Sequence, residues 1–379
     1  MNTLIIILFQ ILFTGHTTFD IMPQKPLSQM NITEVNQLLA EANYRLKIDE
    51  LSAEIDSLCL VLNGSILVAS GKNVLFHRNA GLKRLSDKNA NNNQINFNTQ
   101  FDLASISKQF TAAAILKLAN EGKLSLSDLL TKYFPTLPYP DVRISHLLTH
   151  TSGIPEYIDK EVSFNTSIQL TNEKLIAFLV TQKPKSLFSA GSKFKYINTN
   201  YALLASIIEK VSGTSFTQYI KTNLLAPAAM TNSCFFTELT ANSNICKGHS
   251  GSGKQEPDHF MNGVMGDKGL YSTTLEMHKW AIDYFMDYKI LPKEWIDEAS
   301  APQNIIRGKL PEELYGYGLR IENNPRFGKI VYHGGLWKGF HNIMTFRPSD
   351  QFFIIILSNY RNKAINGRTN ALMGIWDGA

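Results

Sequence analysis

Residues 352–357, Phe-Phe-Ile-Ile-Ile-Leu, constrain the fold of this chain more than any other segment. Six consecutive apolar residues leave no polar face for water, so we expect a strand inside a sheet rather than at its edge. Further strand-like segments lie at 330–332 and 343–346. The central strand needs neighbours on both sides, and the other end of the chain supplies candidates for them.

Two apolar runs near the N-terminus, residues 58–62 and 66–69, flank the pair Asn63-Gly64. An Asn-Gly pair between apolar runs is the strongest short pattern for a two-residue hairpin turn. We therefore expect a β-hairpin over residues 58–69, with Cys59 in a buried strand.

A helix-rich stretch separates these strands from those near the C-terminus. It runs from Ser105 to about Tyr219, and residues 201–211 show helical spacing that ends at Gly213. The order of strands, helices and strands predicts an α+β fold. One antiparallel sheet would be assembled from both chain ends, with an all-helical lobe inserted at about 101–262. Catalytic groups would lie at the seam between the lobes, where pockets favour forming.

Composition limits the class of partner. The 379 residues are 44% hydrophobic and 18% charged, which is ample for a large core. The net charge of +5 is mild and the basic residues are dispersed, so we exclude nucleic acid as a partner. We expect a small-molecule or peptide substrate, and the sequence leaves the oligomeric state open.

Residues 1–18 have the character of a targeting segment. Residues 4–13 are apolar apart from Gln10, a length that suits a signal-peptide core and is too short to span a bilayer. The cleavage site is indistinct, so an uncleaved membrane anchor stays open. We expect an exported protein, periplasmic or secreted, with a linker and helix at 19–57 and a catalytic domain at 58–379.

The chain has three cysteines, Cys59, Cys234 and Cys246, and no C-x-x-C pair. The spacing gives no support to a zinc or thioredoxin-like site. In an oxidising compartment Cys234 and Cys246 could pair, and three free thiols are an equal alternative.

Ser105 and Lys108 stand three residues apart at the head of an apolar run that should be helical to Glu121 and end at Gly122. Their side chains would share one face of the first turn. The helix start offers Ser105 an unpaired backbone N–H and a dipole that favours negative charge. A buried lysine can lose its proton and act as a base. The pair therefore suits a nucleophile and its activator. The alternative is an ordinary capped helix with a solvated lysine, which can carry the same S-x-x-K pattern.

Tyr196 and Asn198 stand two apart just before the helix at 201–211. In extended backbone they would point the same way. A phenol can relay a proton when a nearby cation lowers its pKa, and an amide can hold a substrate carbonyl. The alternative is a tyrosine packed under the helix start, with Asn200 as the helix cap.

A third segment, His333-Gly334-Gly335-Leu336, follows a strand-like stretch. Two glycines after a histidine would let a substrate backbone approach a strand edge closely. The backbone N–H of Leu336 would serve as a second oxyanion donor beside that of Ser105. A plain hairpin turn is the alternative.

These three segments together resemble the serine β-lactamase and penicillin-binding-protein family. The resemblance is closest to the class C branch, which also holds D-amino-acid peptidases and esterases. The family pattern is S-x-x-K, then Y-x-N or S-x-N, then K-T-G or H-x-G, and here it stands at 105–108, 196–198 and 333–335. The resemblance spans about 58–359, and further similar segments are 101–105, 146–153 and 266–272.

The resemblance implies a role for each motif residue. Ser105 would be the acylated nucleophile and Lys108 its base, while Tyr196 shares that proton or delivers it to the leaving group. Asn198 would orient the substrate, and His333 would stand where the family places a cation. Histidine is weakly charged at neutral pH, so peptidase or esterase chemistry is favoured over β-lactam hydrolysis.

The resemblance leaves two other functions open, a catalytically silent protein that recognises cell-wall peptide and a true class C β-lactamase. No cofactor is implied.

Two other patterns resemble known functional motifs but lack residues that those motifs require. Residues 248–255 nearly spell a phosphate-binding loop, but the pattern ends in Gln255 and Pro257 follows, so we expect a flexible loop. His146 and His150 are four apart, yet no glutamate stands between them as a zinc peptidase requires. We expect a structural role for both histidines, and no metal.

Overall fold

The computed structural model describes residues 30–87, 92–241, 243–306, 313–362, 365 and 367–377. The predicted signal peptide or anchor at 1–18 lies outside the described residues. Contacts divide the chain into two compact units. One comprises Met1–Leu58 with Gly367–Ala379, and the other is Cys59–Asn366. No helix among the described residues is long and apolar enough to cross a membrane.

The first unit contains α2 (Ile32–Cys59) and α11 (Arg368–Asp377). At the start of α2 the Asn31 side chain accepts from the Glu34 N–H at 3.0 Å, and the Glu34 carboxylate accepts from the Asn31 N–H at 2.7 Å. This reciprocal cap satisfies two helix-end donors. Arg368 of α11 forms an ion pair with Glu54 of α2 at 2.5 Å.

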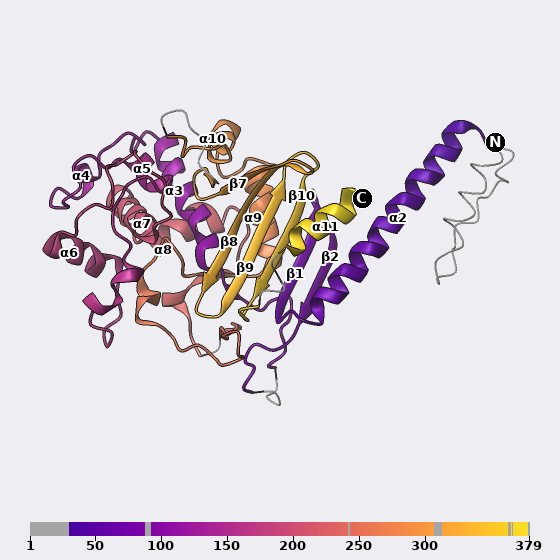
Figure 1. Cartoon of the computed structure of the whole chain (residues 1–379), viewed down its shortest axis with the longest axis horizontal. Coiled ribbons are helices and arrows are strands. Elements are labelled where there is room, and N and C mark those ends of the chain that lie inside the picture. The colour runs from indigo at the N-terminus through magenta and orange to yellow at the C-terminus, as the bar shows by residue number, and fades with distance from the viewer. Residues whose placement is uncertain are drawn as a thin grey trace. The chain divides into compact units, whose positions relative to one another are not determined.

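The second unit is built on a seven-stranded antiparallel sheet in the order β2-β1-β10-β9-β8-β7-β6. Because β1 pairs with β10, strands from both ends of the chain lie side by side (Figure 1). The predicted α+β architecture is confirmed. The strands are β1 (Gly64–Ser70), β2 (Asn73–Ala80), β6 (Leu314–Tyr315), β7 (Arg320–Asn324), β8 (Gly328–Trp337), β9 (Phe340–Arg347) and β10 (Phe352–Ser358).

The apolar run at 352–357 is the internal strand β10, as predicted. All seven residues of β10 are buried, between β1 on one side and β9 on the other. Helix α9 (Thr274–Phe285) packs against β1 and β10. Phe353, Ile355 and Leu357 of β10 belong to the main hydrophobic core.

The predicted hairpin around Asn63-Gly64 is wrong. Helix α2 continues to Cys59, so this residue ends a helix instead of lying in a buried strand, and β1 begins only at Gly64. The hairpin partner of β1 is β2, and Gly71 lies in the turn between them with a φ of +55°.

A different constraint explains the Asn-Gly pair. The Asn63 amide donates to the Leu82 carbonyl at 2.8 Å and accepts from the Leu82 N–H at 2.7 Å. A Cβ on Gly64 would lie 2.1 Å from the Leu357 carbonyl oxygen. The Asn63 side chain therefore links this position to the backbone of Leu82. Gly64, which has no side chain, allows the start of β1 to lie close to β10.

The inserted lobe lies between β2 and β6 and is mostly helical. It also has a small antiparallel sheet in the order β3-β5-β4, so the prediction of an all-helical lobe is corrected there. The predicted helix at 201–211 is α7, which ends at Gly213 with a φ of +71°. The elements are β3 (Phe101–Asp102), η2 (Ala104–Ser107), α3 (Lys108–Asn120), α4 (Leu130–Tyr133), α5 (Ile144–Leu148), η3 (Ile158–Ser163), α6 (Asn172–Gln182), α7 (Asn198–Ser212), α8 (Phe216–Ile220), η4 (Lys221–Leu225), β4 (Cys234–Phe235), η5 (Phe236–Glu238), η6 (Phe260–Gly263), β5 (Leu270–Ser272), α9 and α10 (Lys293–Ala299).

Two further sequence questions are answered in this unit. Cys234 and Cys246 are free thiols, so the alternative in which they pair is not found. In the segment that resembles a phosphate-binding loop, His249 is fully buried and its Nε2 accepts from the Leu85 N–H at 3.1 Å. The expectation of a flexible loop is therefore wrong at His249.

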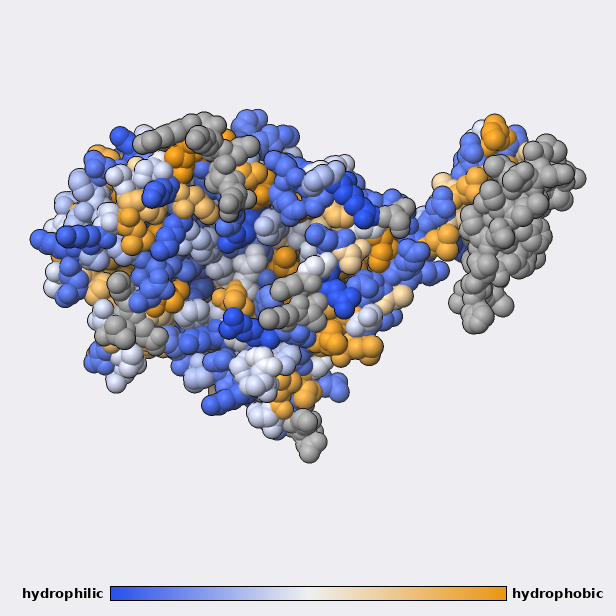
Figure 2. Space-filling view, in the orientation of Figure 1, coloured by the Kyte–Doolittle hydropathy of each residue, from blue (hydrophilic) through white to orange (hydrophobic). Residues whose placement is uncertain are grey.

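The surface gives little sign of an apolar docking face. Large exposed apolar side chains are scattered over many elements, and the face in Figure 2 is a mosaic in which hydrophilic residues predominate. Single exposed apolar residues are normal on soluble proteins.

We predict that Ile355→Ala lowers the free energy of unfolding by about 2–5 kcal/mol, because it removes buried methyl groups from β10 and leaves a cavity. Ile168→Ala is the matched control, since that side chain is 50% exposed and should cost less than about 0.5 kcal/mol. Urea denaturation measures both values. Equal losses at the two positions would show that β10 is not in the core.

Candidate active site

Ser105 lies in the turn between β3 and α3. Ala104, just before it, has a φ of +48°, a left-handed backbone that is uncommon for a residue with a side chain. The Asp102 carboxylate accepts the Ala104 N–H at 2.8 Å and supports this turn. The half-buried Ser105 therefore stands at the N-terminal end of the α3 helix, where a developing negative charge is favoured.

Strand β8 closes against the same turn at Gly335. A Cβ on Gly335 would lie 2.2 Å from the Leu103 carbonyl oxygen. On the neighbouring strand β9, the Asn342 amide donates to the Asp102 carbonyl at 2.7 Å. Gly335, predicted to let a substrate approach, thus lets the nucleophile turn approach the sheet. The next residue, Leu336, is 51% exposed, and its oxyanion role stays a prediction.

Lys108 is fully buried one turn after Ser105. Its Nζ donates to the Ser105 hydroxyl at 3.1 Å, to the Asn198 side-chain oxygen at 2.7 Å and to the Asp267 backbone carbonyl at 2.9 Å. All three acceptors are uncharged. The structure thus joins the first and second motifs directly through this amine.

Burial is the largest influence on the Lys108 amine and lowers its pKa to about 8. The negative charges of Asp267 and Glu156 oppose this shift, and the positive charge of Arg320 adds to it. A lysine in water has a pKa of about 10.4, so this one loses its proton far more readily. The amine therefore suits the role of a base toward Ser105.

Asn198 is the first residue of α7, after an extended Ile197 with a φ of −141°. The Glu156 carboxylate accepts both the Asn198 backbone N–H at 2.6 Å and its side-chain N–H at 2.9 Å. This contact orients the amide so that its oxygen faces Lys108. The sequence interpretation missed Glu156, because no motif spacing marks it.

Tyr196 lies between two cations. The Lys108 Nζ is 4.9 Å from its ring centroid and the Arg320 Cζ is 5.0 Å from it. Burial nevertheless raises the pKa of Tyr196 above its usual range, although Ser105 and Arg320 act in the opposite direction. Arg320 lowers this pKa, as expected of a nearby cation, but burial outweighs it, so Tyr196 is a neutral phenol.

His333 differs most from its predicted role. It is 2% exposed, with Nε2 at 3.0 Å from the Tyr315 hydroxyl and Nδ1 at 2.6 Å from the Gly334 carbonyl. Burial holds its pKa well below the usual range, and Arg320 and Lys108 lower it further. The imidazole is neutral and both nitrogens are occupied. His333 is therefore not a cation here, and its contact with the substrate stays a prediction.

Arg320 supplies the positive charge at this place. It lies on β7 directly opposite Tyr332 of β8, and its side chain is 24% exposed. Its guanidinium faces the Tyr196 ring and forms an ion pair with Glu313. The sequence interpretation missed Arg320, because only the pairing of β7 with β8 brings it to the site.

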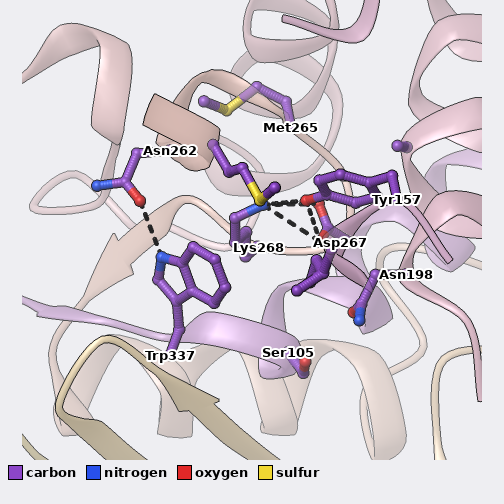
Figure 3. A network of polar contacts seen from close by, with 12 residues as sticks. Ser105, Tyr157, Asn198, Asn262, Met265, Asp267, Lys268 and Trp337 are labelled. Carbon is purple, nitrogen blue, oxygen red and sulfur yellow. Dashed lines mark hydrogen bonds and ion pairs between the residues drawn. The ribbon is translucent and has the colours of Figure 1, made fainter. Parts of the chain in front are cut away.

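Tyr157, Asp267 and Lys268 form a second polar cluster (Figure 3), and the Asp267 backbone carbonyl links it to Lys108. The Asp267 carboxylate accepts from the Tyr157 hydroxyl at 3.0 Å and pairs with the Lys268 amine at 3.3 Å. Lys268 also donates to the Tyr157 hydroxyl. This cluster was missed, although a charged pair within the apolar and glycine-rich residues 263–270 was a usable signal.

The two histidines that were weighed as metal ligands have separate structural contacts. His146 Nδ1 accepts from the Arg143 N–H at 3.2 Å, and His150 Nδ1 accepts from the Ile197 N–H at 3.2 Å. The His150 ring also packs on Tyr196, with centroids 4.3 Å apart. Within the described residues there is no group of three or more potential metal ligands.

Comparison with known proteins agrees with this geometry. The Beta-lactamase family profile matches residues 58–373. The chain belongs to the Beta-lactamase family. It is 30% identical over 313 residues to Penicillin-binding protein 4* of Bacillus subtilis (strain 168), which covers 78% of this chain and 68% of that protein. It is 29% identical over 276 residues to the putative penicillin-binding protein PbpX of the same strain, which covers 72% and 65%.

Solved structures of this family have the same fold. A penicillin binding protein from Bacillus halodurans aligns with a TM-score of 0.72 and 25% identity over 86% of this chain and 98% of that one. An octameric penicillin-binding protein homologue from Pyrococcus abyssi aligns with a TM-score of 0.73 and 28% identity over 92% and 78%. This family member spans about two thirds of the length of its Bacillus subtilis relatives. The class C branch stays a prediction.

We predict that Gly335→Ala displaces the nucleophile turn, because the added Cβ meets the Leu103 carbonyl oxygen. Overpacking of this kind lowers the free energy of unfolding by about 1–3 kcal/mol. Because the turn positions Ser105, we expect a loss of activity beyond what this loss of stability alone would cause. The adjacent Gly334→Ala is the control, since its Cβ would be 3.7 Å from the nearest atom. Thermal melting and Ser105 labelling measure both effects. Equal behaviour of the two variants would contradict the close contact.

Proposed function

We propose that this protein is a serine hydrolase that acts through an acyl-enzyme on peptide, amide or ester substrates. The observation that supports this most is the buried Lys108 amine, 3.1 Å from the Ser105 oxygen and surrounded by uncharged acceptors. A lysine in this setting takes up a proton from a hydroxyl far more easily than a solvated one. Export of the protein by residues 1–18 stays part of the proposal.

In the proposed acylation, the Ser105 oxygen forms a bond to the substrate carbonyl carbon as its proton passes to Lys108. The negative charge on the carbonyl oxygen is stabilised by the backbone N–H groups of Ser105 and Leu336. The bond to the leaving group then breaks, and water later hydrolyses the Ser105 ester to release the acid.

Tyr196 completes the proton path as a neutral phenol. Its hydroxyl donates a proton to the leaving group, and the Lys108 ammonium returns one to the phenol oxygen. The net result is transfer of the Ser105 proton to the leaving group, so a phenolate is never required. The raised pKa of Tyr196 keeps this phenol protonated between proton transfers.

Asn198 and Arg320 are the proposed substrate contacts. One amide hydrogen of Asn198 is used by Glu156, which leaves the other for a substrate carbonyl. Arg320 presents a guanidinium, a group that binds carboxylates through two parallel hydrogen bonds. We therefore place a substrate carboxylate against Arg320, which favours peptides with a free carboxyl end. A silent binding protein is disfavoured because it has no need of the Lys108 arrangement.

We predict that a fluorophosphonate labels wild-type protein on Ser105 and leaves Ser105→Ala unlabelled. The labelling rate should rise with pH through a midpoint near 8, because Lys108 must be unprotonated to act as the base. Lys108→Arg keeps the charge and cannot accept a proton, so it should slow labelling by roughly 10²–10⁴-fold. Lys132→Arg, on the exposed side of α4, is the matched control.

Intact-protein and peptide mass spectrometry measure this labelling. An adduct on Ser107 or Ser250, or normal labelling of Lys108→Arg, would contradict the assignment of nucleophile and base.

We predict that Arg320→Gln lowers kcat/KM about 10- to 100-fold for a peptide with a free carboxyl end, and much less for its amidated twin. In wild type the ratio of the two kcat/KM values should stay flat between pH 5.5 and 7.5, since guanidinium groups keep their charge and burial holds the pKa of His333 well below its usual range. The exposed Arg326→Gln is the control. If the ratio falls as pH rises through about 6 to 7, the substrate carboxylate is bound by His333 and not by Arg320.

A further inference from the structure

Lys268 is a buried cation that the proposed reaction does not use. It is 3% exposed and directly follows Asp267, whose backbone carbonyl accepts from Lys108. Its Nζ faces both oxygens of the Asp267 carboxylate at 3.3 and 3.4 Å. The amine also lies 5.1 Å from the Tyr157 ring centroid and 4.8 Å from that of Trp337 (Figure 3).

Trp337 is fixed in place by a hydrogen bond from its ring N–H to the Asn262 side-chain oxygen at 2.8 Å. Two aromatic faces and a carboxylate therefore enclose the Lys268 ammonium. Burial lowers the pKa of Lys268, whereas Asp267 and the buried Asp102 raise it. Aromatic faces stabilise a desolvated cation as well. Burying the Lys268 and Asp267 charges costs solvation free energy, and buried ion pairs are often no more stable than apolar residues in their place. The presence of this buried pair therefore calls for an explanation.

The carboxylates near Lys108 both point away from its amine. Asp267 turns its carboxylate to Tyr157 and Lys268 and presents only its backbone carbonyl to Lys108. Glu156 directs its carboxylate to Asn198. Within the described part of the chain neither carboxylate forms an ion pair with Lys108.

Among the described residues, none of the other groups around Lys108 carries a negative charge. Burial keeps His150 and His333 neutral by lowering their pKa values, and it keeps the tyrosines neutral by raising theirs. Arg320 is a like charge. In the part of the chain that the structure describes, the set that acts on the amine is Ser105, His150, Glu156, Tyr196, Asn198, Tyr201, Asp267, Lys268, Arg320 and His333.

Without Lys268, the Asp267 carboxylate would be an unpaired negative charge close to Lys108. An opposite charge within about 4–6 Å raises the pKa of a lysine by roughly 1–3 units and keeps it protonated. The Lys268 ammonium offsets part of that charge and, by attracting the carboxylate, keeps it turned from the base.

We propose that Lys268 is a positioning residue that keeps Lys108 available as a base by pairing with the Asp267 carboxylate and holding it away. The inference rests on the proposed function, since it concerns the base that activates Ser105. Lys268 acts on Lys108 through Asp267 and also by direct repulsion between the two amines, which lowers the pKa of Lys108 in the same direction. Its effect should therefore appear in the pH dependence of Ser105 reactivity.

The test is the rate of fluorophosphonate labelling of Ser105 against pH in full-length protein. Lys268→Met should move the midpoint upward by about one unit or more, because the unpaired Asp267 charge favours protonated Lys108. Asp267→Asn should move it downward, because the Lys268 charge is then uncompensated. The double variant Asp267→Asn with Lys268→Met removes both charges and should return the midpoint close to wild type. Lys268→Arg retains the positive charge and should leave the midpoint at its wild-type value.

Lys72→Met is the matched control, because Lys72 also pairs with an aspartate but is exposed and belongs to another region. It should leave the midpoint unchanged. Thermal melting at each pH separates misfolding from a shift in the midpoint. If Lys268→Met does not fold, Lys268→Gln, which also removes the charge, takes its place in the same measurement.

An unchanged or lower midpoint in a folded Lys268→Met overturns this inference, and so does a double variant that stays shifted. If wild type labels on Ser105 with a clear midpoint and the variants do not differ, the proposed function survives and only the role of Lys268 fails. If wild type is not labelled on Ser105, both fail.

Discussion

The amine of Lys108 lies in the protein interior against three oxygen atoms, and each of them belongs to an uncharged group. An ammonium ion at this place would gain hydrogen bonds but no partner charge, so the interior weakens its hold on the proton. The remaining site geometry supports this one arrangement. Glu156 orients the Asn198 amide, Lys268 pairs with the Asp267 carboxylate, and the left-handed turn at Ala104 brings Ser105 within reach.

The fold makes this arrangement possible because it brings three distant segments together. The pairing of β1 with β10 closes the sheet from both chain ends, and β8 of that sheet contacts the Ser105 turn at Gly335. The inserted lobe contributes α7, which begins with Asn198, and the segment that carries Asp267. The reacting groups thus come from separate layers, and each side chain is oriented by a neighbour from another segment.

Local patterns were predictable from the sequence, and long-range electrostatics were not. The Ser105–Lys108 pair, the end of α7 at Gly213 and the internal strand β10 each follow from short-range spacing or composition. The hairpin at Asn63 failed because its amide is used by Leu82, nineteen positions away. His333 failed because its charge depends on burial and on Arg320, which only the sheet pairing supplies. Glu156 has no motif at all, since its partner Asn198 lies on another segment. Lys268 was missed although its partner Asp267 is the preceding residue.

Direct titration of the Lys108 amine tests the central claim most closely. Protein labelled with 13C at the lysine Cε carbon gives one NMR resonance for each lysine, and comparison with Lys108→Arg assigns the one that disappears. Our account predicts that this resonance titrates with a midpoint near 8, as burial against uncharged acceptors requires. A midpoint at the ordinary lysine value of about 10.4 would contradict it, because Lys108 would then stay protonated when Ser105 reacts.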